Sequence, residues 1–295
     1  MLHQTPTFKV TPYNRIRSHQ QGLSLIELMV GIAIGLMVVV VAMVALMTSR
    51  GITGTVTDAT SMQQQASYAF RVIGQQIRQA GSIELSLTPS ISTTSTSDTN
   101  AAMAPVAFDP PDPTNARPPF VRADHTITGT STPLSFTAGH QNYTESIISG
   151  ATTTTSSLLR DCLGQNGALS TGGSLEKTPV ISSKFERDTA KNELQCSGAG
   201  SSGKQTIIGN VTDMSIRYVE QSPKSTDLKY LTPNLTPNDW SSIYAIEVCL
   251  ELTGNDAIPT SNATYINCSG IETAYGDRLK MVFKNLYQIR SQGQI

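Results

Sequence analysis

The chain has 295 residues, of which 21 are basic and 22 acidic, so its formal net charge is −1. This balance argues against a general nucleic-acid binder, which is usually clearly basic. Only two of the four histidines, His125 and His140, lie beyond the first 22 residues, and both occur in loop-like sequence. We therefore expect solvated histidines, no bound metal, no cofactor and no enzymatic activity.

The first element in the chain is a long apolar run over residues 23–47, LSLIELMVGIAIGLMVVVVAMVALM. No charge occurs in the 22 residues from Leu28 to Ser49. A helix of that length rises about 33 Å, which is enough to cross a hydrocarbon core of about 30 Å. Three basic and no acidic side chains precede the run, and Arg50 is the only nearby cation after it. This bias predicts a cytoplasmic N-terminus, with everything beyond Arg50 on the other side of the membrane.

A secretory signal peptide or a plain membrane anchor explains this run only in part. A signal peptide has an apolar region of about 7 to 15 residues before a small-x-small cleavage site. This run is longer, and Ala42–Ser49 matches such a site only loosely. An anchor accounts for the length but not for Glu27, because a carboxylate within an apolar run costs about 3 kcal/mol and normally marks a function.

Residues 21–27, QGLSLIE, resemble the prepilin motif of type IV pilins and type II secretion pseudopilins. In that motif a Gly, a hydrophobic residue, Ser or Thr, two aliphatic residues and a Glu open a long apolar helix behind a basic leader. The resemblance implies that residues 1–22 are a leader, cleaved after Gly22 by an inner-membrane aspartyl peptidase, and that Leu23 is N-methylated. The motif usually has Phe in place of Leu23. Major pilins often have a Pro in the apolar stretch, and its absence here favours a minor subunit.

Glu27 is the residue in this motif to which we assign a role in assembly. We expect its carboxylate to pair with the amine of Leu23 on the adjacent subunit. Each of these two charges is costly by itself among packed apolar helices, and each relieves the other only when the helices are in register.

The helical pattern continues past Arg50. Apolar or small side chains recur at every third or fourth position, which predicts one stripe along a helix: Ile52, Val56, Ala59, Met62, Ala66, Phe70, Ile73, Ile77 and Ala80. With Gly81 as a C-cap, we expect a helix from about Ser24 to Ala80 that is transmembrane over 23–49 and amphipathic over 50–81. Its ending, IRQAG, resembles the end of this helix in PilW-type minor pilins.

Residues 82–295 are expected to form an α+β head. The part up to residue 160 is rich in Ser, Thr and Pro, which predicts loops with short strands at Thr126–Thr128 and Leu134–Thr137. Three later segments alternate apolar and polar residues, as half-buried strands do: 214–218, 244–252 and 279–289. We expect them to form an antiparallel sheet with one face on the helix stripe and the other in water, which is a pilin-like fold. Their order and spacing resemble the closing strands of PilW.

The four cysteines, Cys162, Cys196, Cys249 and Cys268, all follow the apolar run, so the predicted topology places them in the oxidising periplasm. An even number predicts two disulfides, and the absence of a C-x-x-C pair argues against zinc. Three connectivities are possible. We favour Cys162–Cys196 and Cys249–Cys268, because Cys249 alternates onto the outward side of its strand, where a cysteine in a nearby loop can reach it.

Two further patterns receive ordinary interpretations. Gly198–Gly203 matches GxGxxG and precedes Lys204, but a P-loop needs Ser or Thr and then a helix, whereas Gln205 opens a strand-like segment. We interpret it as a hairpin loop. The outward side of the last strand carries four cations that could touch DNA or an acidic subunit: Arg278, Lys280, Lys284 and Arg290. We favour a solvated strand face, since a few surface cations bind only weakly.

These features predict a PilW-like minor pilin of a type IV pilus, which acts in pilus assembly and priming. It would sit in the inner membrane with its head in the periplasm, and then in the pilus at the cell surface. The expected partners are other minor pilins, the major pilin and the prepilin peptidase, without nucleic acid. The alternatives are a J-type minor pseudopilin of a type II secretion system, a DNA-binding competence pilin, and a membrane-anchored enzyme. The last is disfavoured because no catalytic constellation stands out.

Overall fold

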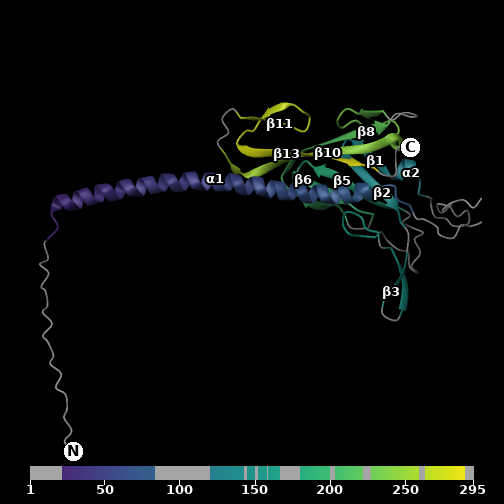
Figure 1. Ribbon diagram of the computed structural model, residues 1–295, viewed down its shortest axis with the longest axis horizontal. Coiled ribbons are helices and arrows are strands. Elements are labelled where there is room, and N and C mark those ends of the chain that lie inside the picture. Colours follow the sequence, from purple (N-terminus) through teal and green to yellow (C-terminus); the bar gives the residue numbers. More distant parts are fainter. Residues whose placement is uncertain are drawn as a thin grey trace, which may run out of the picture. The chain divides into compact units, whose positions relative to one another are not determined.

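Figure 1 shows the computed structural model of the chain. The structure describes residues 22–83, 120–142, 145–149, 152–157, 159–166, 180–199, 203–221, 227–258 and 263–289. Residues 1–21 of the expected leader, the Ser/Thr- and Pro-rich runs within 84–119, and Arg290 lie outside them. The described residues fall into two compact units, divided between Ile52 and Thr53.

One helix, α1 (Leu25–Gln79), starts in the first unit and ends in the second. Its ends lie close to the predicted Ser24 and Ala80. The stretch Leu25–Met47 has 23 residues, a mean hydropathy of 2.9 and no buried side chain, so its length and composition suit a membrane span. Gly81 follows the helix with a φ of 73°, in the left-handed region that glycine adopts without steric cost.

The second unit contains the rest of α1 and two antiparallel sheets. One sheet has the strand order β1-β2-β5-β6-β7, the other has the order β13-β10-β8-β9, and β3–β4 and β11–β12 are separate hairpins. The elements after α1 are α2 (Arg122–His125), β1 (Ile127–Ser131), β2 (Leu134–Gln141), β3 (Glu145–Ser149), β4 (Thr152–Ser156), β5 (Val180–Asp188), β6 (Glu193–Ser197), β7 (Gln205–Ile208), β8 (Val211–Gln221), β9 (Leu228–Tyr230), the 3₁₀-helix η1 (Trp240–Ser242), β10 (Ile243–Ala257), β11 (Thr264–Ile266), β12 (Glu272–Ala274) and β13 (Arg278–Gln288).

The core of the second unit lies between α1 and the inner faces of both sheets. A single cluster of buried apolar side chains joins these elements, and α1 contributes a stripe to the core: Met62, Ala66, Ala69, Ile73 and Ile77. The apolar alternation of β8, β10 and β13 aligns the same face of all three strands with this stripe. The predicted α+β, pilin-like fold is therefore confirmed: an apolar N-terminal helix precedes an antiparallel β head.

The predicted helix stripe is wrong at its beginning. Val56 was expected in the core but is 60% exposed, whereas Asp58 is buried. The Asp58 carboxylate accepts a hydrogen bond of 2.9 Å from the backbone N–H of Asp256, at the end of β10. Gly254 leaves the room for it, since a Cβ there would lie 2.5 Å from the Asp58 carboxylate. A backbone N–H thus replaces the apolar partner that periodicity predicts.

The outer face of the second sheet also differs from the prediction of a solvated face. Cys249 and Glu251 point away from the helix, yet they are only 2% and 4% exposed. The β11–β12 hairpin accounts for this burial, because Cys268 next to β11 is bonded to Cys249. A short strand pair of low hydrophobicity covers the strand face that the sequence assigned to water.

The first sheet was not foreseen as a unit. The short strands predicted near Thr126 and Leu134 are longer, and β2 pairs with both β1 and β5. The Phe136 and Phe185 rings stack within this sheet, with centroids 5.0 Å apart. β2 buries polar side chains such as His140, so its sequence lacks the apolar alternation that marks the later strands.

Candidate processing and assembly site

The segment expected to be processed lies directly before α1. Gly22, Leu23 and Ser24 are not helical, and Leu23 is 77% exposed. The first helical hydrogen bond joins the N–H of Leu28 to the carbonyl oxygen of Ser24, at 3.2 Å. Ser24 is thus the N-cap, and the Gly22–Leu23 bond lies in non-helical chain that an enzyme could accept without unwinding a helix.

Ser24 and Glu27 form a reciprocal cap at this helix start. The N–H of Glu27 donates to Ser24 Oγ at 3.2 Å, and the Glu27 carboxylate accepts from the Ser24 N–H at 3.4 Å and from its hydroxyl at 3.5 Å. This arrangement is a capping box, which satisfies helix N–H groups that lack an intrahelical partner. The contacts to the carboxylate are long, so Glu27 keeps the capacity to bind a closer cation.

Glu27 is the only charged residue of α1 before Arg50. Around it, no described part of the chain buries the apolar side chains of Leu25–Met47, which are exposed from Leu25 at 77% to Met47 at 73%. Cleavage after Gly22 would turn the nitrogen of Leu23 into an α-amine, which is largely protonated near neutral pH. The sequence then carries an anion and a cation four positions apart on an otherwise apolar segment.

Comparison with known proteins supports this reading of the N-terminus. Residues 17–46 match the family described as the prokaryotic N-terminal methylation motif. A type IV-like pilin from Thermus thermophilus is similar in structure over 57% of this chain and 85% of its own, at 12% identity and a TM-score of 0.31. No curated protein matches the chain. The chain therefore carries the N-terminal methylation motif that residues 21–27 predict.

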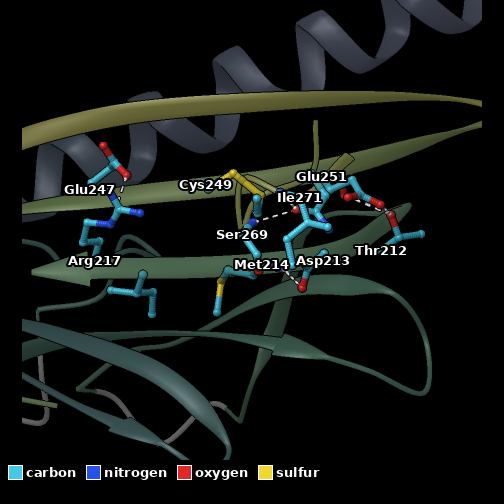
Figure 2. The surroundings of a disulfide bond; sticks show 12 residues. Thr212, Asp213, Met214, Arg217, Glu247, Cys249, Glu251, Ser269 and Ile271 are labelled. Atoms are coloured by element: carbon cyan, nitrogen blue, oxygen red, sulfur yellow. Dashed lines mark hydrogen bonds and ion pairs between the residues drawn. A yellow bond between two sulfur atoms is a disulfide. The ribbon is translucent and has the colours of Figure 1, made fainter. Parts of the chain in front are cut away.

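The structure joins the head cysteines in the two pairs that the sequence favours. Cys249 and Cys268 are bonded with a Cα–Cα distance of 5.7 Å, and the bond fixes the β11–β12 hairpin to β10 (Figure 2). Beside it, Lys280 Nζ lies 3.8 Å from Glu251 Oε1 and 5.6 Å from the centre of the Tyr265 ring. The hairpin is thus held by a covalent bond and by side chains of two neighbouring strands.

The other pair, Cys162–Cys196, has a Cα–Cα distance of 6.5 Å and lies against a loop centred on Asp161. Asp161 is 3% exposed. Its carboxylate accepts three backbone hydrogen bonds, from Leu163 at 2.8 Å, Gln165 at 2.9 Å and Ala199 at 2.9 Å. One buried carboxylate therefore organises both sides of the disulfide, and sequence reasoning missed it.

The same carboxylate accounts for the beginning of the glycine motif at 198–203, whose residues 200–202 lie outside the described part of the chain. The N–H of Ala199 donates to Asp161, and a Cβ at Gly198 would overlap the same carboxylate. Lys204, which stood in the P-loop position, forms an ion pair with Glu186, and Lys184 Nζ lies 3.1 Å from the same side chain. Burial acts to raise the pKa of Glu186, but the two lysines outweigh it and hold that pKa below its usual value. The chain's own acids thus bind the N–H of Ala199 and the ammonium of Lys204, two groups that a phosphate would need.

The cations of the last strand are not a free basic stripe. Lys280 faces Glu251, and Arg278 Nη1 donates to the carbonyl oxygen of Gly254 at 3.4 Å. Lys284 is exposed. Lys280 is thus paired with an acid, and the exposed Arg278 has a carbonyl partner, so these two are not a row of unpartnered cations.

Non-reducing peptide mapping tests the cysteine pairing. We expect peptides that join Cys162 to Cys196 and Cys249 to Cys268 in material from the periplasm or the pilus. The paired Cys249→Ser and Cys268→Ser variant should lower the free energy of unfolding by about 3 kcal/mol, since its bond closes a loop of moderate length. Cleavage after Gly22 should be unchanged. Free thiols, or a Cys196–Cys249 peptide, would contradict the pairing.

His140 gives the head a predicted pH dependence. It was expected to be solvated, but it lies on β2 with 1% exposure. Burial lowers its pKa to about 4, although the Asp161 charge acts in the opposite direction. Because the unfolded chain takes up this proton near pH 6.5 and the folded chain does not, stability should fall by about 3 kcal/mol as the pH drops from 6.5 to 4.

This dependence is measured as the free energy of unfolding in guanidinium at several pH values. His140→Gln should flatten the profile between pH 6.5 and 4, even if the variant is less stable throughout. His125→Gln is the matched control, since His125 lies outside the core and accepts the backbone N–H of Val121 at 2.9 Å. An unchanged profile in His140→Gln would show that other groups cause any acid sensitivity.

Proposed function

We propose that this protein is a PilW-like minor pilin with a structural role in the assembly of a type IV pilus. In this proposal the chain enters the inner membrane with its head in the periplasm, is cleaved after Gly22 and is N-methylated at Leu23. It then joins the pilus beside other minor pilins and the major pilin. The observation that carries the proposal is Glu27, the one carboxylate of the apolar stretch Leu25–Met47, which has no buried side chain and lies largely within the match to the N-terminal methylation motif.

The physical argument concerns what can neutralise Glu27 once apolar helices surround it. Among the described residues, the hydrogen bonds that its carboxylate accepts are the long ones from Ser24. The α-amine of Leu23, released by cleavage, is the cation produced at the right depth in every subunit. In a helical array of subunits, the carboxylate of one chain can meet the amine of the next, which ties processing to assembly.

Two observations favour a minor pilin over the alternative roles. The apolar part of α1 contains no Pro and forms one uninterrupted helix, consistent with the sequence argument against a bulk fibre subunit. Of the described cations expected to serve a DNA-binding competence pilin, Lys280 pairs with Glu251 and Arg278 donates to the carbonyl oxygen of Gly254. A J-type pseudopilin of a secretion system would have the same N-terminal chemistry. The two roles are therefore distinguished by whether the chain is incorporated into a pilus or into a secretion system.

Mass spectrometry of the mature chain and of sheared pili tests the proposal. We expect a chain that begins with methylated Leu23, present in pili at a low ratio to the major pilin. A chain that still begins with Met1 in membranes with active peptidase would refute the processing. A correctly processed chain that is absent from pili, but required for secretion of a folded exoprotein, would identify the pseudopilin instead.

A further inference from the structure

The exposed side of α1 in the second unit contains an open groove. Its volume is about 540 Å³, and the described residues that line it are six exposed residues on one face of α1: Thr60, Gln63, Gln64, Ser67, Tyr68 and Arg71. Their spacing of three and four residues places them along a single face for about 16 Å. A second helix lying along this face would meet these side chains, as in the packing of two helices.

The groove presents both polar and apolar surface. Hydroxyl and amide groups lie along it, and among the described residues that line it the ring of Tyr68, which is 47% exposed, is the aromatic one. Arg71 stacks over that ring, with its guanidinium carbon 5.6 Å from the ring centre. Stacking on an aromatic face restricts a guanidinium while leaving its N–H groups free to bind a carboxylate with two hydrogen bonds.

The exposed charges on this part of the helix are both positive. From Thr53 to Gln79, α1 carries Arg71, Arg78 and one acid, Asp58. Both arginines are exposed, and neither forms an ion pair within the described part of the chain. Asp58 is 6% exposed and bound to the N–H of Asp256, so it cannot serve a neighbour. A second copy of this helix would bring two more arginines and no available carboxylate.

We infer that the groove around Arg71 is the docking surface for an acidic helix of a different pilin-like subunit. The inference rests on the proposed function, in which subunit helices lie side by side, and adds the chemistry of the neighbour. That neighbour carries Asp or Glu on the helix face that meets Arg71, and polar side chains along the amide and hydroxyl groups of the groove. Charge makes the choice of neighbour selective. A carboxylate on an acidic helix attracts Arg71, whereas the arginines on the same helix of a second copy of this chain repel it.

Site-directed photocrosslinking in cells that make pili tests this pairing. Gln64 of the full chain is replaced by p-benzoylphenylalanine, and the cross-linked peptide is identified by mass spectrometry. We expect a helix of another pilin-like subunit with Asp or Glu within about one turn of the attachment point. The matched control places the same probe at Tyr230 on β9, which is 53% exposed and remote from α1 in sequence; it should not capture that peptide.

Charge variants in the same cells give the second measurement. Arg71→Glu should reduce both the cross-link and the amount of this chain in sheared pili about tenfold or more. The reason is that the new carboxylate at position 71 would face the carboxylate of the neighbouring helix and repel it. Arg71→Lys should give an intermediate loss, since an ammonium lacks the planar fork. Lys229→Glu, at an exposed position of β9, makes the same charge change elsewhere and should stay within about twofold of the wild type.

The outcomes separate the inference from the proposed function. If the wild-type chain is absent from pili, both are wrong. If it is present but Arg71→Glu is incorporated equally well, the docking inference alone is wrong. Cross-links to a second copy of this chain, to nucleic acid or to no partner would also overturn it.

Discussion

Glu27→Val is expected to leave membrane insertion intact and to remove the chain from pili. In the bilayer Val is the cheaper residue, so the level of the variant in inner membranes should equal or exceed that of the wild type. Cleavage after Gly22 should persist, because the peptidase acts beside the scissile bond. Assembly should fail because the amine of Leu23 on a neighbour would be left alone among apolar helices, at a cost of about 3 to 5 kcal/mol. The measurement is the amount of the chain in sheared pili relative to membranes.

Glu27→Gln separates the two roles that the structure gives this side chain. Gln can still accept from the N–H of Ser24 and complete a capping box, but it carries no charge. If the charge pair drives assembly, Gln should fail as Val does. Wild-type incorporation of Gln alongside loss of Val would show that the helix cap matters and the ion pair does not. Loss of either variant from membranes would point to a role in insertion, which the pairing argument does not predict.

The elements that sequence reasoning found share one property, which is that their signal is local. The apolar run, the stripe along α1 and the alternation in β8, β10 and β13 each depend on residues a few positions apart. The pairing of Cys249 with Cys268 was accessible for the same reason, since the strand period places Cys249 on the outer face and its partner lies 19 residues away.

The features that escaped prediction depend on contacts between distant segments. Asp58 is buried because a backbone N–H of β10, 198 residues further along the chain, satisfies its carboxylate. Ser183 was unremarkable in sequence, yet it donates to Gln76 of α1 at 3.0 Å and accepts the N–H of Cys162 at 3.0 Å. Buried polar groups of this kind interrupt the apolar periodicity at positions where the fold needs a hydrogen bond. Periodicity assigns such polar residues to the solvent-exposed side, so it does not predict their burial.

The candidate site likewise has a part that a local sequence pattern predicts and a part that it does not. Gly22, Leu23 and Glu27 belong to a contiguous motif, so the sequence alone points to them, and their cleavage, N-methylation and pairing stay predictions. The reciprocal cap with Ser24 adds a second role for Glu27, since Ser-x-x-Glu before an apolar run is itself a capping signal. The groove around Arg71 was not foreseen, because it is defined by exposure and by the absence of available acids rather than by any motif.

Asp161 and Gly198 are expected to show strong coupling in the stability of the head. Asp161→Ala leaves three backbone N–H groups without their acceptor, which should lower the free energy of unfolding by about 3 kcal/mol or more. Gly198→Ala places a Cβ against the Asp161 carboxylate and should cost about 2 kcal/mol by overpacking. The three atoms nearest to such a Cβ all belong to Asp161.

The double variant should therefore be less destabilised than the sum of the two single variants, by about 2 kcal/mol, because removal of the carboxylate also removes the clash. Guanidinium unfolding of the full chain in detergent measures this through Trp240, the single tryptophan, whose ring lies 5.2 Å from that of Tyr218. Gly203→Ala, in the same glycine-rich segment but with no atom within 4 Å of its Cβ position, is the matched control and should have little effect. If the losses in the free energy of unfolding were additive, the Asp161 carboxylate would not lie against position 198 as described. The glycine at that position would then need another explanation.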